Sequence, residues 1–293
     1  MSFQITTAFV QQYGATVMHL VQQKGSRLRD CVRTEMLAAE FGFFDQLGTA
    51  AAQKRVTRHG DTPQVDTPHS RRQVSMEDYE WADLIDQQDK IRTIADFTSP
   101  YAQSAAFALG RSMDDVVIAA ATGAAKTGKA GTTSVALPAG QKIATGAAGL
   151  TIAKLIAAKE ILDAAENDPT EERYIAVRAK DVSTLLGTTQ VTSADFNTVK
   201  TLVEGRIDTF MGFKFIRIER LLDSTLGTQT GSVNDKGLIA WRKSGLLLAI
   251  GQNPTTKISE RDDKSYATQV YTSMSIGATR MEEQAVVEIS VQP

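Results

Sequence analysis

The sequence predicts an α+β fold. Three observations support this prediction: a long helical pattern with one apolar side at residues 99–122, a strongly alternating β pattern after residue 265, and a long polar stretch at 53–76. A helix that is apolar on one side packs against another layer, which we expect here to be a sheet. The 293 residues are enough for one large domain or two modest ones.

The predicted helix at 99–122 has clear signals at both ends. Ser99 is a good N-cap, and Pro100 suits the first helical position. Gly123 can end the helix in the left-handed conformation. The apolar side follows the spacing of one helix face and consists of Ala102, Ala105, Ala106, Leu109, Met113, Val116, Val117 and Ala120.

The other predicted elements are shorter. Shorter helices are expected at about 151–166, from Asp181 as a cap to Gly187, and from Ser193 as a cap to Gly205. Strands are expected at 173–179, 212–219 and 238–250. Strict alternation at 266–276 and again at 287–291 predicts a terminal hairpin with two different faces.

The stretch at 53–76 has almost no large apolar residues, so it cannot bury a core of its own. Pro63 and Pro68 exclude a helix, and Gly60-Asp61 is a turn sequence. A loop of this length in a compact domain is either disordered or built to bind something.

The charge changes sign along this part of the chain. Residues 53–74 contain five Lys or Arg and two Asp, whereas residues 75–96 contain seven acids and two basic residues. One interpretation is a solvated loop followed by a solvated acidic helix. The other is a basic arm that docks on an acidic patch of a neighbouring copy. The candidate contact residues of the second interpretation are Arg55, Arg58, His59, Arg71, Arg72, Glu80, Asp83, Asp86 and Asp89.

The composition argues against several classes of protein. A net charge of -2 is not typical of a protein whose main role is to grip nucleic acid. Cys31 is the only cysteine, so the chain can form neither an intrachain disulfide nor a cysteine cluster for a metal. No apolar run approaches the ~20 residues of a membrane helix, and the N-terminus lacks a signal-peptide pattern. We therefore expect a soluble protein that is intracellular when made.

The nearest approach to a catalytic motif is Gly123–Ala130, which almost matches a phosphate-binding loop. Ala130 stands where a hydroxyl must reach the magnesium ion, and the segment follows a helix where such a loop must follow a strand. A Gly/Lys hairpin is the better interpretation.

Two further groups of acidic or histidine residues resemble possible sites only superficially. The pairs Asp86/Asp89 and Asp114/Asp115 suggest a solvated or interface face more than a hydrolase dyad. His59 and His69 flank a polar loop with two acids, but their spacing matches no known ligand set. The sequence thus predicts no catalytic, cofactor or metal site, and no enzyme.

Several segments together resemble the major capsid proteins of tailed bacteriophages, the family with the Johnson or Hong Kong 97-like fold. The similar segments are Thr57–Pro63 and Asp66–Arg72, then Asp78–Asp86 with Gln88–Lys90, then Ser99–Ala102 with Gly110-Arg111 and Met113–Asp115, and finally Ser265–Tyr271 with Gly277–Arg280. They are not catalytic signatures, and their value lies in their order and spacing. The resemblance covers nearly the whole chain from about residue 40.

This resemblance implies a division of the chain. Residues 1–52 would be an N-terminal arm, and 53–92 an extended loop with its acidic flank. Residues 93–149 would begin the peripheral domain, with the spine helix at 99–122. Residues 150–254 would be the axial domain, and 255–293 would complete the peripheral domain with a β-hairpin. The coreless stretch at 53–76 would then find its partner in another copy.

The resemblance also implies a function. Copies of the chain would form pentamers and hexamers of an icosahedral shell around the double-stranded DNA genome, without sequence-specific DNA binding or a membrane. Scaffolding, portal and possibly decoration proteins would be partners. Assembly would take place in the host bacterial cytoplasm, and the protein would remain in the virion capsid.

Three alternatives stay open. An encapsulin-like nanocompartment would share the fold but hold protein cargo, and neighbouring terminase and portal genes would argue against it. A nucleotide-dependent enzyme would rest on Gly128-Lys129 and would have to bind ATP. A monomeric binding module would be recognised by its size alone.

Overall fold

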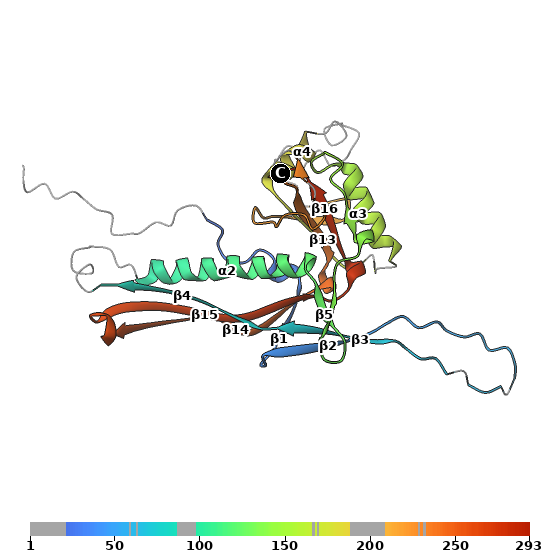
Figure 1. The fold of residues 1–293 in the computed structure, drawn as a ribbon, viewed down its shortest axis with the longest axis horizontal. Helices are drawn as coiled ribbons and strands as arrows, with labels where there is room; N and C mark the ends of the chain where they lie inside the picture. The colour runs from blue at the N-terminus through green and yellow to red at the C-terminus, as the bar shows by residue number, and fades with distance from the viewer. Residues whose placement is uncertain are drawn as a thin grey trace, which may run out of the picture. The chain divides into compact units, whose positions relative to one another are not determined.

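The computed structural model describes residues 22–58, 60–62, 64–86, 98–165, 168, 170–187, 209–227, 229–230 and 233–293 (Figure 1). The chain divides into two compact units. One consists of Met1–Ser26, Asp78–Ser112 and Gln252–Ser275, and the other of Arg27–Glu77, Met113–Gly251 and Ile276–Pro293. Helices and sheets occur together, so the α+β prediction is confirmed.

The larger unit contains a six-stranded sheet with the order β7-β16-β13-β8-β10-β9. Its strands are β7 (Lys142–Ile143), β8 (Arg173–Val177), β9 (Thr209–Phe210), β10 (Phe213–Arg217), β13 (Lys236–Arg242) and β16 (Val286–Val291). All of β8 and β16 is buried, as expected for central strands covered on both faces. Strands β8 and β10 confirm the strands predicted at 173–179 and 212–219.

Two helices belong to the same unit. Helix α3 (Ile152–Ala164) begins after Thr151, whose hydroxyl accepts the backbone N–H of Lys154, and it packs beside β16. Helix α4 (Ala179–Leu186) ends before Gly187 as predicted. It begins two residues before Asp181, however, so Asp181 is not the cap itself. The Asp181 carboxylate accepts the Arg178 backbone N–H at 3.2 Å from inside the first turn.

The prediction of a terminal hairpin is wrong. Strand β15 (Ala267–Arg280) lies in a four-stranded sheet with the order β1-β14-β15-β4, whereas β16 lies in the six-stranded sheet. The two edge strands of the four-stranded sheet are β1 (Arg33–Met36) and β4 (Glu77–Ile85). Strand β15 pairs with β14 (Leu246–Arg261) on one side and with β4 on the other, and the 3-10 turn Asp262–Lys264 joins β14 to β15. The alternation of side chains predicted that both segments are strands. It contained no information on which strands pair, because a period of two residues is the same for every possible partner.

The strand predicted at 238–250 is in fact two strands. Strand β13 ends at Arg242, a 3-10 turn spans Lys243–Gly245, and β14 begins at Leu246 in a different sheet. Glycine is required at position 245 because a Cβ there would lie 2.6 Å from the Cβ of Ala285. The polar residues Arg242–Gly245 separate two apolar runs, and they were the available signal for this boundary.

The long helix is confirmed as α2 (Thr98–Thr122). Its buried face contains Ala105, Leu109, Met113, Val117, Ile118 and Ala121. The predicted face is right along most of its length, although Ala106 is exposed and Ala121 is buried instead. The helix begins at Thr98, so Ser99 lies inside its first turn and is not the N-cap that the sequence predicted. The helix predicted from Ser193 lies outside the described residues. No described helix is long and apolar enough to cross a membrane.

A second four-stranded sheet of the larger unit has the order β2-β3-β5-β6. It pairs β2 (Phe41–Leu47) antiparallel with β3 (His69–Ser75), and β5 (Ala125–Thr127) antiparallel with β6 (Thr133–Val135). Residues 41–47 were expected in an extended arm, but they form one strand of a hairpin with β3 instead. The structure thus places the loop between two strands of its own chain.

Candidate inter-subunit site

The loop between β2 and β3 has no partner in its own chain among the residues that the structure describes. Every described residue from Gly48 to Pro68 is exposed, and none belongs to a helix or strand. A hydrogen bond from Gly48 N to Pro68 O, 2.8 Å long, closes the neck of the loop. Beyond this neck the two limbs extend past the ends of β2 and β3 (Figure 1). Val56 is 89% exposed, so the loop buries no apolar side chain there against its own chain.

The basic residues of the loop are displayed to solvent. Arg55 and Arg58 are exposed, and the Arg55 Nε donates only to Thr57 O, at 3.1 Å. His59 lies outside the described residues. These cations are available to a partner, as the basic-arm interpretation requires.

Arg71 lies on the outer face of the loop stem, which we define as β2 and β3. It forms an ion pair with Asp45 of β2 at 2.6 Å, and its guanidinium lies 5.4 Å from the centre of the Phe43 ring. The hydrogen bond from Arg71 lowers the pKa of the Asp45 carboxyl, and the positive charge acts in the same direction. Phe41, Phe43 and Leu47 are exposed on this same face.

Arg72 faces the opposite way and is committed to its own chain. Its Nη2 contacts Glu283 Oε1 and Oε2 at 2.6 and 2.7 Å, and its Nε donates to Met281 O at 2.9 Å. The side chain is 8% exposed. We had expected it to contact a neighbouring subunit, but burial beside Glu283 gives it an intrachain role instead.

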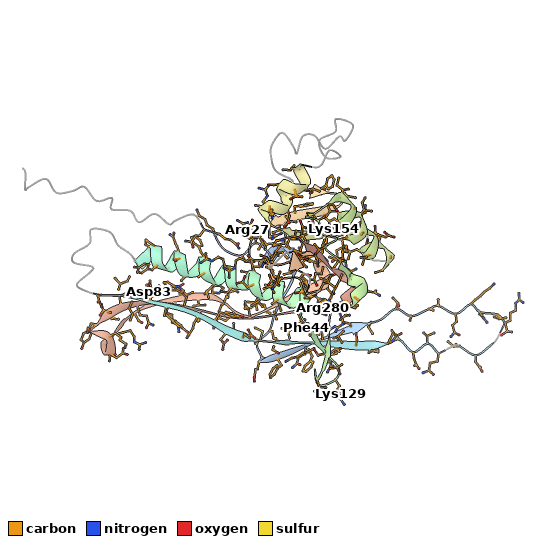
Figure 2. The ribbon with its side chains drawn as sticks, turned by 45° about the horizontal axis from the view of Figure 1, so that its top comes forward. Arg27, Phe44, Asp83, Lys129, Lys154 and Arg280 are labelled. Carbon is orange, nitrogen blue, oxygen red and sulfur yellow. The ribbon has the colours of Figure 1, made fainter. Side chains whose placement is uncertain are left out.

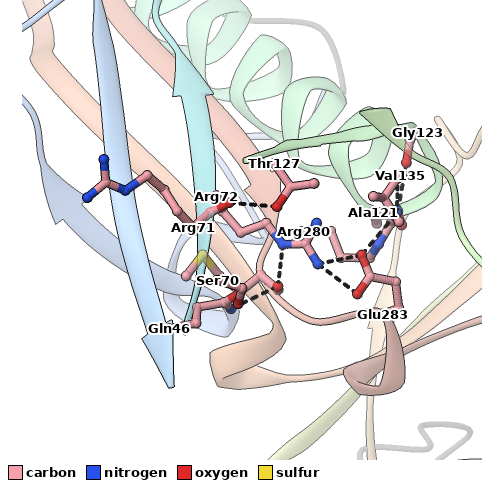
Figure 3. Close-up of polar contacts among 11 residues, drawn as sticks. Gln46, Ser70, Arg71, Arg72, Ala121, Gly123, Thr127, Val135, Arg280 and Glu283 are labelled. Carbon is pink, nitrogen blue, oxygen red and sulfur yellow. Dashed lines mark hydrogen bonds and ion pairs between the residues drawn. The ribbon is translucent and has the colours of Figure 1, made fainter. Parts of the chain in front are cut away.

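The Arg72–Glu283 pair is part of an anchor that holds the stem to the body of the unit (Figure 3). Gln46 Nε2 donates to Met281 O at 2.9 Å, and Thr127 Oγ1 donates to Arg71 O at 2.8 Å. Val74 and Phe44 add apolar contacts with a cluster that includes Met281. The loop therefore projects from a stem that several elements fix in place.

Arg280 completes this anchor, and the sequence analysis missed it. Its Nη1 donates to Ala121 O and Gly123 O at 3.0 and 2.7 Å, and its Nη2 donates to Val135 O at 2.9 Å. Arg280 thus caps the carboxyl end of α2, where the helix dipole favours a cation. The available signal was an arginine at the end of a strand that is otherwise buried on one face.

The acidic flank forms a strand. Residues predicted as an acidic helix in one interpretation make up β4 (Glu77–Ile85), an edge strand of its sheet. Glu80 accepts a hydrogen bond from the Tyr271 hydroxyl at 3.1 Å. Asp83 and Asp86 are exposed, and Figure 2 shows Asp83 on β4. Asp89 lies outside the described residues. Asp83 and Asp86 therefore display carboxylates to solvent at the end of β4, whereas Glu80 is bonded to Tyr271.

The geometry gives no support to nucleotide binding at Gly123–Ala130. This segment forms β5 and the turn to β6, and Lys129 lies at the tip of that hairpin (Figure 2). No helix begins at the turn, so no helix N-terminus faces a phosphate. Positive φ at Gly128 and Gly131, +93° and +66°, explains both glycines as turn residues.

The structure also bears on the acidic pair, on metal binding and on the single cysteine. Asp114 was expected on a solvated face, but it is fully buried and accepts the backbone N–H groups of Arg27 and Leu28 at 3.0–3.1 Å. Among the described residues, no group of three or more His, Cys, Asp or Glu could hold a metal ion. Burial raises the pKa of the Cys31 thiol to about 11, which disfavours the thiolate that a nucleophile needs.

Comparison with solved structures shows how widely this fold occurs in phage capsids. The capsid of cyanophage P-SCSP1u aligns with a TM-score of 0.75 and 16% identity, over 98% of this chain and 94% of that one. The capsid of Ralstonia phage GP4 gives 0.73 and 10%, over 97% and 95%. The cyanophage Pam1 capsid gives 0.72 and 15%, over 99% and 98%. At these identities the likeness shows the fold alone.

The fold is the one that these phage capsid structures share. A sequence model of the phage capsid protein family matches residues 5–292, and the chain belongs to that family. The resemblance and the fold inferred from the sequence are thereby confirmed, and the function is that of a major capsid protein. The encapsulin-like alternative is not favoured. No curated protein matches the chain significantly in sequence.

Proposed function

We propose that copies of this chain close an icosahedral shell around double-stranded phage DNA, with the loop at 48–68 laid across a neighbouring subunit. The observation that carries the proposal is the loop itself, which is exposed along its described length on an anchored stem. An ordered stem is useful to a binding loop because it reduces the entropy that binding must overcome.

We propose the acidic edge β4 of a neighbouring copy as the partner of the loop. Arg55 and Arg58 supply exposed cations, and Asp83 and Asp86 supply exposed carboxylates. Exposed pairs of this kind contribute little energy each, about 0–1 kcal/mol. They set the register between copies, while repetition over many subunits makes the shell stable.

A charge exchange tests this contact. The double variant Arg55→Asp/Arg58→Asp should assemble poorly, because two cations of the loop become anions opposite other anions. Adding Asp83→Arg and Asp86→Arg should restore assembly, because the signs are then complementary again. Particle yield by electron microscopy and sedimentation measures both effects.

The matched control reverses two exposed cations elsewhere. Lys126→Glu/Lys129→Glu makes the same change of charge on the β5–β6 hairpin, and we expect it to leave assembly unchanged. An assembly defect of equal size in this control would show a general charge effect. Failure of the acidic exchange to restore the loop variant would rule out β4 as the partner.

The division of the chain remains part of the proposal. We place the arm before residue 41, the loop hairpin at 41–75 and the spine helix at α2, and we assign the six-stranded sheet to the axial domain. Strand β16 pairs with β13 in that sheet, which supports moving residues 286–291 from the peripheral to the axial domain.

The remaining elements of the proposal concern partners and chemistry. We propose that scaffolding and portal proteins take part in assembly in the host cytoplasm, and that decoration proteins are added later. A structural role without catalysis fits the capsid family and the geometry of Gly128-Lys129. ATP binding by the purified protein would contradict that part.

A further inference from the structure

The outer edge of β14 is open over much of its length. Strand β1 (Arg33–Met36) pairs with this edge only over Leu247–Ile250, and Leu37 N then donates to Ile250 O at 3.0 Å. Beyond Ile250 no described strand pairs with the edge, whereas β15 pairs with the other side. Every residue from Gln252 to Arg261 is exposed. An edge of this length is a template on which another strand can add.

Pro254 lies inside this open stretch. Backbone groups alternate between the two edges of a strand, and the carbonyl of Ile250 faces the outer one. Residues 252 and 254 therefore face the outer edge as well. The N–H that proline lacks falls on the open side, so no hydrogen bond to β15 is lost.

Strands β14 and β15 stay paired beyond Pro254. Thr256 Oγ1 and Thr272 Oγ1 lie 3.0 Å apart, so β14 still lies beside β15 two residues beyond Pro254. Thr255, Thr256 and Ile258 are β-forming residues, and Ile258 is 52% exposed. Without Pro254, the composition of this stretch would favour pairing with a strand of another chain.

We propose that Pro254, together with the charge of Lys257, prevents a second copy of the chain from adding a strand to the outer edge of β14. Subunits of a shell are held close together in large numbers, so an adhesive edge would compete with the correct contacts. Proline and lysine on an edge are general means of preventing such pairing. The proline and the lysine thus prevent hydrogen bonds between the main chains of two copies at this edge. Contacts between copies are then made by side chains.

The first test is Pro254→Thr in the full chain. This variant restores the outward N–H and adds a β-forming residue, so we expect concentration-dependent loss of soluble subunit with a gain of cross-β dye fluorescence. Thr255→Val is the control, because it raises β propensity at a neighbouring residue whose N–H faces β15. Wild-type solubility of Pro254→Thr at every concentration would overturn the proposal.

A pair of new prolines tests the geometry independently. Ile258→Pro removes an outward N–H and should leave the melting temperature nearly unchanged. Lys257→Pro removes an N–H that faces β15 and should lower the melting temperature clearly. Equal losses in the two variants would show that the alternation inferred at Pro254 is wrong.

Discussion

Glu283 lies between two buried arginines of the stem anchor. Its Oε1 is 2.6 Å from Arg72 Nη2 and 3.9 Å from Arg280 Nη2, and the two arginines come from strands β3 and β15 (Figure 3). One carboxylate therefore offsets two guanidinium groups. The Arg280 guanidinium donates hydrogen bonds to three backbone carbonyls, whereas the Arg72 guanidinium donates to one. Glu283 consequently matters most to Arg72 and to the stem.

We predict that Glu283→Gln destabilises the fold by about 3 kcal/mol, because it leaves a buried arginine without its counter-charge. Chemical denaturation of the unassembled subunit measures the change. Arg72→Met/Glu283→Leu removes both charges and should recover much of the loss. A double variant as unstable as Glu283→Gln would show that the loss does not come from the unpaired cation.

Arg280→Met should loosen the carboxyl end of α2. The three carbonyls of Ala121, Gly123 and Val135 would lose a charged donor, at a cost of about 2–4 kcal/mol. Amide hydrogen exchange should rise in the last turn of α2 and in β6. Exchange that rises uniformly over the whole chain would contradict a local capping role.

Lys154 connects α3 to strand β16 through a buried hydrogen bond. Its Nζ donates to Ala148 O, Gly149 O and Ser290 O at 2.8–2.9 Å, and burial lowers its pKa. Lys154→Met should cost about 2–3 kcal/mol, because three buried carbonyls lose their donor. Lys159→Met is the matched control on the exposed side of α3. Equal stability of the two variants would contradict this role.

Cys31 should react slowly with alkylating reagents in the folded subunit. Burial raises its pKa from 9.0 to about 11, so the folded state holds about a hundredfold less thiolate at pH 8 than the unfolded chain. Because the folded pKa is the higher one, the stability contributed by the neutral thiol is present below pH 9 and is lost as the pH rises toward 11. Iodoacetamide labelling at pH 8, with and without denaturant, measures the difference. Equal rates would contradict the burial.

Elements with a strong local pattern were predictable from sequence. Helix α2 has a long one-sided periodicity and a glycine beyond its end, and the loop has almost no large apolar residues to bury. Both features depend on neighbours along the chain. The pairing of β15 with β14 and of β16 with β13 depends on distant segments, and period-two alternation is the same for every possible partner.

The site illustrates the same limit at the scale of one residue. Arg71 and Arg72 are adjacent, yet one faces solvent and the other is buried against Glu283. Successive side chains of a strand point to opposite faces, so the register of β3 decides between them. Val74, two residues after Arg72, is buried on the same face, and it was the one clue in the sequence.

The central claim is that this chain builds a closed shell, and electron microscopy of the purified protein tests it most directly. The chain should be produced with and without candidate scaffolding partners, and each sample should also be sized by chromatography. The account predicts closed shells, or pentamers and hexamers, with density for the loop at 48–68 lying across an adjacent subunit. A strictly monodisperse monomer under every condition, scaffolding partner included, would contradict it.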